Sequence, residues 1–122
     1  MPLITIFSPA ERSDGIRDII EDVRKRGADA LECPPSNVWV IFSPVLANHY
    51  VQDGEEGKSG LVKSPIVIVR AQKGRTAKQK DAFVVAITSA IAKGLSVPTE
   101  RVWVHYQEME PKEVWFGNQW AG

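Results

Sequence analysis

The sequence has a single cysteine, no net charge and no long hydrophobic run. Cys33 therefore has no partner for an internal disulfide, and no group of cysteines and histidines has the spacing of a zinc site. Fifteen basic and fifteen acidic side chains cancel, so no basic surface favours nucleic acid or an anionic membrane. No apolar run approaches the roughly 20 residues of a membrane span, and the first residues lack the cationic start of a signal peptide. We expect a cytoplasmic protein that binds neither nucleic acid nor membrane, and no metal.

One sequence pattern occurs twice in the chain. The segment Pro2–Phe7 is matched by Pro65–Arg70, and later positions of the two copies match with a shift of one residue. The copies span residues 2–45 and 65–109. The Gly-rich, charged stretch from about residue 46 to residue 64 connects them.

Each copy is predicted to be a strand, a helix and a strand. In the first copy, Leu3–Phe7 is a short apolar strand, and a helix follows with Ser13 as its N-cap. Pro34, next to Cys33, ends this helix. The β-branched and aromatic segment Val38–Phe42 is the second strand.

The second copy carries clearer helix signals. Thr76 and Gln79 fit a capping box at the start of its helix, and Gly94 is the expected residue just after the end. Val102–Tyr106 is the second strand of this copy.

A strand, a helix and a strand in this order form a parallel unit. Two copies predict an α/β (α+β) fold, one domain over residues 1–122, with a four-stranded sheet and two helices on one face. The segments Val38–Phe42 and Ile66–Val69 are apolar on both faces, whereas two helices cover only one. We expect the same surface of sister subunits to cover the other face, which makes the protein an obligate oligomer.

Pro2 directly after Met1, the short apolar strand and Glu11-Arg12-Ser13-Asp14 together resemble the start of 4-oxalocrotonate tautomerase-type subunits. The second copy resembles two-unit members of the tautomerase superfamily, including the cis-3-chloroacrylic acid dehalogenase-like group. The resemblance lies in Gly74-Arg75-Thr76, Val97-Pro98 and the Val-Trp-Val strand. The resemblance covers nearly the whole chain. It implies a homotrimer of two-unit subunits and a cofactor-free acid/base enzyme for a small anionic carboxylate.

Pro2 is the candidate catalytic residue. Proline alone has a secondary α-amine, and ordinary α-amino groups titrate at about 7.7–8.0. Removal of Met1 exposes that amine, and an apolar site or a nearby cation lowers its pKa so that it accepts a proton at neutral pH. Pro65 has the same repeat position, but its nitrogen is an internal amide, so only one of the two sites is expected to be active. The alternative is that Pro2 merely starts the first strand.

Four cations are candidates for holding the substrate carboxylate. Arginine grips a carboxylate with two N–H groups, and the resemblance assigns this role to Arg75. The motif of the second copy is expected to approach Pro2, so Arg75 ranks above Arg12, which belongs to the inactive site. Arg70 and Lys73 would add positive charge around Pro2, and solvated loop cations are the equal alternative.

Aromatic side chains are candidates for an apolar wall that excludes water. They are Trp39, Trp103, Trp115 and Phe116. Core or interface packing is the alternative for each of them. His105 alternates with Trp103 along the strand and shares its face, which places it near the site; a packed interface histidine is the competing interpretation.

The chain departs from the family at several positions. The second-strand arginine of the one-unit tautomerases is Trp39 in one copy and Trp103 in the other, which weakens a preference for dicarboxylates. The dehalogenase-like relatives have a water-activating glutamate where this chain has Trp115, with Glu113 two positions earlier. Malonate semialdehyde decarboxylase-like members have an aspartate near the start of the first copy's second strand, which this chain lacks.

These features predict a keto–enol tautomerase for 2-hydroxy-2,4-dienoates or phenylenolpyruvate-like acids, with Pro2 as general base and acid. The alternatives are a hydratase, dehalogenase or decarboxylase of small three-carbon acids, and a non-catalytic oligomer in which Pro2 is not used. Retention of Met1 would favour the last of these.

Overall fold

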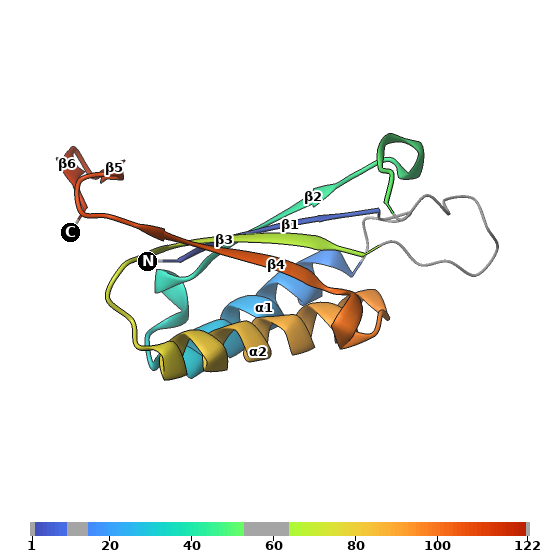
Figure 1. Ribbon diagram of the computed structural model, residues 1–122, viewed down its shortest axis with the longest axis horizontal. Coiled ribbons are helices and arrows are strands. Elements are labelled where there is room, and N and C mark those ends of the chain that lie inside the picture. Colours follow the sequence, from blue (N-terminus) through green and yellow to red (C-terminus); the bar gives the residue numbers. More distant parts are fainter. Residues whose placement is uncertain (1, 10–14, 53–63, 122) are drawn as a thin grey trace.

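The computed structural model describes residues 2–9, 15–52 and 64–121 (Figure 1). A four-stranded sheet has the strand order β2-β1-β3-β4. The bounds are Leu3–Ser8 for β1, Trp39–Pro44 for β2, Ile66–Gln72 for β3 and Trp103–Met109 for β4. β1 pairs with β2 and β3 pairs with β4 in parallel, whereas the central strands β1 and β3 are antiparallel. The predicted fold of two β-α-β units is confirmed.

Two long helices cover one face of this sheet (Figure 1). They are α1 (Ile16–Leu31) and α2 (Ala77–Leu95). Three single-turn 3₁₀ helices connect elements: η1 (Pro35–Asn37), η2 (Ala47–His49) and η3 (Thr99–Arg101). A hairpin of β5 (Trp115–Phe116) and β6 (Gln119–Trp120) forms a separate small sheet, which was not predicted from the sequence. Figure 1 shows this hairpin beyond the end of β4, away from both helices.

Alternating side chains of the strands build the core between the sheet and the helices. Ile4, Ile6, Val67 and Val69 of the central strands are fully buried. They form one cluster with side chains from both helices, which include Val23, Phe83, Ile87 and Ile91. The helices therefore cover one face of the sheet. Every second side chain of each strand points to that face.

The opposite face of the sheet is apolar and open. Trp39 and Ile41 of β2 expose 42% and 51% of their surface, and Trp103 of β4 exposes 55%. These residues alternate with the side chains that face the helices. The surface that the sequence assigns to sister subunits is thus present in the single chain.

The helix starts confirm one predicted cap and correct the other. The Thr76 hydroxyl accepts a hydrogen bond from the Gln79 backbone N–H at 3.1 Å, and the Gln79 side chain accepts one from the Thr76 N–H at 2.9 Å. This is the predicted capping box of α2. Helix α1 begins at Ile16 with Gly15 as its cap residue, and Ser13 lies outside the described residues.

Gly94 does not end α2, contrary to the sequence prediction. The helix continues to Leu95, and Ser96 adopts the left-handed conformation after it, with φ of 56°. The reason for glycine at position 94 is helix packing. A Cβ atom there would lie 2.7 Å from Cγ1 of Ile19 in α1, so the two helices approach closely only without a side chain.

We expect Gly94→Ala to destabilise the protein by about 1–2 kcal/mol. Overpacking against Ile19 costs about 1–3 kcal/mol, while the higher helix propensity of alanine returns up to about 1 kcal/mol. Urea unfolding measures the difference. In an Ile19→Ala background the same substitution should be neutral or stabilising, because the clash is absent. An equal loss in both backgrounds would contradict this explanation.

Candidate functional site

Pro2 and Pro65 occupy equivalent positions at opposite ends of the central strand pair. The Trp39 N–H donates to the Pro2 carbonyl at 3.0 Å, and the Trp103 N–H donates to the Pro65 carbonyl at 3.0 Å. Both proline side chains are fully buried. Because β1 and β3 are antiparallel, Pro2 lies beside the end of β3 and Pro65 lies beside the end of β1. The sequence repeat is thus a pseudo-twofold relation between the two ends of the sheet.

The loop between β3 and α2 lies at the Pro2 end of the sheet (Figure 1). Leu3 pairs with Arg70, so the last residues of β3 run past Pro2 and lead into the loop that carries Arg75. Nη1 of Arg75 donates to the backbone carbonyl of Gln72 at 3.3 Å. Among the described residues, no carboxylate forms an ion pair with Arg75. This half-buried guanidinium therefore keeps its positive charge for an external anion.

Three side chains of α2 and β4 form a cluster with Arg75. The Arg75 guanidinium lies near enough to the Tyr106 hydroxyl for its charge to lower the pKa of the phenol. Nζ of Lys80 lies 4.8 Å from the centroid of the Tyr106 ring and 3.9 Å from Oε1 of Glu108. Glu108 is the register partner of Ala71, next to the Pro2 end of β3. This end of the sheet thus combines an unpaired arginine with a phenol and a lysine–glutamate pair.

Tyr106, Lys80 and Glu108 were not among the site residues predicted from the sequence. The available signal was strand alternation: Tyr106 and Glu108 are two residues apart on β4 and so share a face, and that face is opposite to the one of His105. Which of the two faces carries the site depends on the loop of Arg75, whose path the sequence pattern does not contain.

Burial raises the pKa of the Tyr106 phenol above its ordinary value of 10.0. The nearby charge of Arg75 acts in the opposite direction, since it favours the phenolate, and the charge of Glu108 raises the pKa further. The phenol is therefore protonated at neutral pH.

We expect Tyr106 to titrate above pH 10, and Arg75→Ala to raise its pKa further because the stabilising cation is lost. Absorbance at 295 nm in the wild type and in Tyr106→Phe isolates this phenol. Since the folded pKa exceeds the unfolded one, the unfolded chain releases the proton first, and the contribution of Tyr106 to stability falls as pH rises above about 10. Tyr106→Phe should remove that part of the alkaline loss, whereas titration below pH 10 would contradict the assignment.

Trp39 lies beside Pro2 within the same chain. Its backbone N–H bonds to the Pro2 carbonyl, and it begins β2. Its ring contacts Phe116 of the hairpin, with centroids 5.2 Å apart and an interplanar angle of 78°. Trp39 and Phe116 are therefore the predicted aromatic residues that one subunit brings toward its own Pro2 end.

Trp103 lies at the other end of the sheet. Trp103 is the register partner of Ile66, the residue after Pro65. Its ring centroid lies 6.1 Å from that of His105. His105 shares the open face with Trp103, as predicted. Trp115 packs edge-on against Trp120 within the hairpin, with centroids 5.2 Å apart. A role for Trp103 at Pro2 thus requires a neighbouring subunit.

The other predicted cations differ in their surroundings. Lys73 pairs with Glu110 at 3.2 Å, which leaves its charge largely compensated. Arg70 is exposed and alternates with the buried Val69, so it belongs to the open face. Arg12 lies outside the described residues. Arg75 remains the cation at the Pro2 end that is half-buried and unpaired.

The second copy of the repeat matches a known family. Residues 65–119, which begin at Pro65, match the family model of the tautomerase enzymes. A comparison with curated protein sequences gave no match.

Solved structures match nearly the whole chain. A native fused 4-OT has a TM-score of 0.87 at 23% identity, over 97% of this chain and 94% of that one. A fused 4-OT that forms an asymmetric trimer has a TM-score of 0.84 at 22% identity, over 97% and 94% of the two chains. N1, a member of the cis-3-chloroacrylic acid dehalogenase family, has a TM-score of 0.77 at 25% identity, over 98% and 83%.

The second copy thus matches the tautomerase family, and the whole chain has the fold of the fused 4-OT structures.

The segment that matches the family model contains Arg75, Tyr106 and the hairpin as far as Gln119. The first copy contributes Pro2 and Trp39 to the same end of the sheet. Each copy therefore supplies a different part of the candidate site, and the antiparallel pairing of β1 with β3 brings the parts together.

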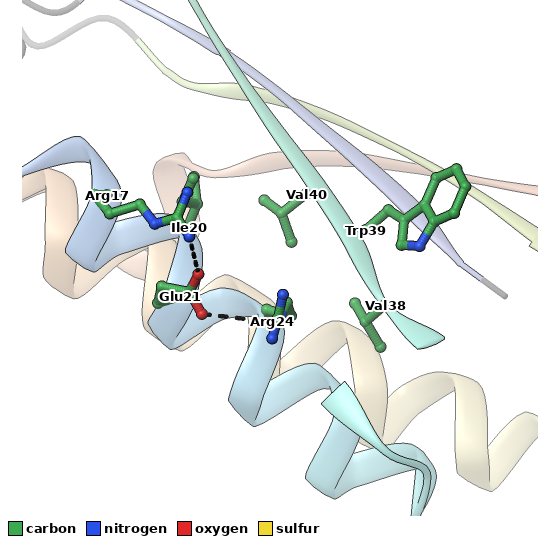
Figure 2. Close-up of a pocket in the computed structure, with 7 residues that line it drawn as sticks. All are labelled: Arg17, Ile20, Glu21, Arg24, Val38, Trp39 and Val40. Atoms are coloured by element: carbon green, nitrogen blue, oxygen red, sulfur yellow. Dashed lines mark ion pairs between the residues drawn. The ribbon is translucent and has the colours of Figure 1, made fainter. Parts of the chain in front are cut away.

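A hollow of about 220 Å³ between α1 and the edge strand β2 is distinct from this site (Figure 2). Arg17 and Arg24 on its helical side both pair with Glu21, at 3.0 and 3.7 Å. Figure 2 shows Val40 pointing toward the helix and Trp39 pointing away from it. The two arginines of the hollow share this one carboxylate, and its one candidate site residue, Trp39, faces elsewhere.

The described part of the chain contains no group of three or more metal-ligating side chains. Over the same residues, no helix is long and apolar enough to cross a membrane.

Proposed function

We propose that this protein is a cofactor-free keto–enol tautomerase for 2-hydroxy-2,4-dienoates or phenylenolpyruvate-like acids, with Pro2 as the proton-transfer group. The observation that carries the proposal is the placement of the unpaired Arg75 at the Pro2 end of the sheet. A base and an anion holder are the two groups that ketonisation of an enol acid needs.

The reaction requires one proton to move from oxygen to carbon. With Met1 removed, the Pro2 nitrogen takes the proton from the enol hydroxyl, and the electron pair forms the carbonyl. The protonated amine then returns a proton to the terminal carbon of the former double bond or diene. Arg75 holds the carboxylate throughout, and the rings of Trp39 and Phe116 shield the site from water.

The working form is proposed to be a homotrimer. The open sheet face exposes Trp39, Ile41 and Trp103, and one of the similar fused 4-OT structures is a trimer. Burial of this face also gives Trp103 and His105 a route to the Pro2 end of a neighbouring subunit. Sedimentation equilibrium should give three times the mass of the chain; a monomer at micromolar concentration would contradict this part of the proposal.

The test is ketonisation of 2-hydroxymuconate and phenylenolpyruvate, followed by ultraviolet absorbance. The protein used must show an intact mass without Met1, because an attached methionine turns the Pro2 amine into an amide. Turnover above the buffer rate by the processed protein supports the proposal. No turnover of either substrate, or turnover independent of Pro2, would exclude it.

A hydratase or dehalogenase of three-carbon acids is the second candidate, because the chain is 25% identical to a member of the cis-3-chloroacrylic acid dehalogenase family. Such chemistry needs a carboxylate that activates water. Glu113, two positions before Trp115 in the sequence, is the candidate, but its Oε2 accepts a hydrogen bond from the Glu110 N–H at 3.2 Å. Halide release from 3-chloroacrylate, lost in Glu113→Gln, would favour this candidate over the tautomerase.

A further inference from the structure

The open face of the sheet consists of three rows of side chains that run across all four strands. The registers of the strand pairs fix these rows, because side chains alternate between the two faces of a strand. His105 lies at the end of the middle row, on the edge strand β4. From β2 to β4, the rows are Trp39, Leu3, Arg70 and Gln107; Ile41, Thr5, Ile68 and His105; and Ser43, Phe7, Ile66 and Trp103.

Arg70 and His105 are the ionisable side chains of these rows. Neither β1 nor β2 contributes one, and among the described residues Arg70 has no ion pair. The ring centroid of His105 lies 6.1 Å from that of Trp103, its neighbour on the same face of β4. A proton on His105 would thus add a second cation to a face that is otherwise apolar or neutral.

The carboxylates of β4 and of the turn after it have other partners. Glu108 points to the helix-covered face, where Nζ of a lysine of α2 lies 3.9 Å from it. Glu110 pairs with Lys73 at 3.2 Å, and Oε2 of Glu113 accepts the Glu110 N–H at 3.2 Å. Within the described strands, the open face therefore offers no carboxylate to a protonated His105.

The sequence repeat shows which side chain the first copy has at the position of His105. Trp39 corresponds to Trp103, so Ile41 corresponds to His105. The two residues form opposite ends of the middle row, and both are exposed in the single chain. An assembly that covers this pseudo-twofold face covers both positions. The second copy thus places a titratable ring where the first copy has a hydrocarbon side chain.

We propose that His105 makes assembly of the protein sensitive to acid: the neutral ring is buried between subunits, and the protonated ring favours their separation. The inference rests on the homotrimer of the proposed function, which covers this face with the same chain. Histidine side chains ordinarily change charge between pH 5 and 8. Covering an imidazolium removes its hydration, and the Trp103 ring attracts a cation too weakly to replace it. Because the covered ring binds a proton less readily than the exposed one, assembly weakens as pH falls.

The test measures the trimer fraction of the full-length protein by sedimentation velocity at pH 8.0 and pH 5.5. Urea is present at the concentration that dissociates half of the wild-type trimer at pH 8.0, so that a shift in either direction is visible. His105→Ile copies the side chain of the first repeat, and His105→Gln keeps a polar group that takes up no proton. His49→Gln is the matched control, because His49 is the other histidine of the chain and lies exposed in η2, outside the sheet.

For the wild type we expect the protein concentration at half-assembly to rise about tenfold or more between pH 8.0 and pH 5.5. This is the effect of one excluded proton per subunit, about one pH unit below the ordinary histidine pKa of about 6.5. His49→Gln should show the same rise. In His105→Ile and His105→Gln the concentration should change by less than about threefold, because no proton is taken up at this position.

Three results would overturn the inference: equal acid weakening in the wild type and both His105 variants, a wild-type trimer whose stability does not change with pH, or a monomer at pH 8.0 without urea. The proposed activity fails separately. An acid-sensitive trimer that ketonises no enol acid would support the role of His105 and reject the tautomerase, and an active enzyme with a pH-independent trimer would do the reverse.

Discussion

Replacing Pro2 by alanine is expected to lower kcat/KM for enol ketonisation by about 10²–10⁴-fold, the range for loss of a general acid/base. Alanine also has an α-amine, but it lacks the ring that fixes the nitrogen at the start of β1. The Pro2 ring is fully buried and its carbonyl accepts a hydrogen bond from Trp39, so the structure holds this residue firmly. Stopped-flow or steady-state absorbance at the enol band measures the loss.

Pro65→Ala is the matched control for this variant. Pro65 has the same burial and the same carbonyl contact with the start of a strand, but its nitrogen is a peptide amide. We expect activity within about threefold of the wild type, with any lost packing visible as a lower Tm. The wild-type sequence with Met1 retained should be as inactive as Pro2→Ala. Equal losses in Pro2→Ala and Pro65→Ala would show that the effect is structural.

Arg75→Ala is expected to raise KM for enol carboxylates about 10- to 100-fold. A charge-assisted hydrogen bond contributes about 1.5–3 kcal/mol, and Arg75 has no carboxylate partner among the described residues that would compensate for its loss. Arg75→Lys should recover only part of the affinity, because lysine cannot bind a carboxylate with two parallel N–H groups. Steady-state kinetics over a range of substrate concentrations separates KM from kcat.

Arg12→Ala is the control for Arg75→Ala, because Arg12 occupies the related position of the first copy in the sequence. The sequence repeat predicts that Arg12 belongs to the Pro65 site, whose amide nitrogen is not a base, so we expect a change of KM below about threefold. A larger effect of Arg12→Ala than of Arg75→Ala would mean that the anion-binding arginine was assigned to the wrong copy.

The secondary structure and the repeat are readable from the sequence because their causes are local. Short apolar segments rich in β-branched and aromatic residues predicted the four strands, and the Thr76–Gln79 pair predicted the start of α2. A capping box depends on residues three positions apart, so no distant contact is needed to recognise it. The sequence also predicted that two helices would leave the second face of the sheet uncovered. The exposed side chains of Trp39, Ile41 and Trp103 agree with this prediction.

The sequence also distinguished the two prolines by chemistry. An α-amine exists only at a chain start, so Pro2 was the candidate base and Pro65 was not. The pairing of Pro2 with Arg75 was predicted from the repeat, and the antiparallel register of β1 and β3 places the Arg75 loop at the Pro2 end. Their joint role in catalysis stays a prediction until the variants are measured.

Tertiary structure decided the features that depend on distant residues. The residue type of Gly94 predicted the end of a helix, but Gly94 lies inside α2. Glycine is needed there because Ile19 of the other helix leaves no room for a Cβ atom. The division of the tryptophans, with Trp39 at Pro2 and Trp103 at Pro65, follows from strand register. The electrostatic interaction of Arg75 with Tyr106 joins a loop to a strand 31 residues later. Such contacts have no periodic or local signal, since the packing of α2 on the sheet creates them.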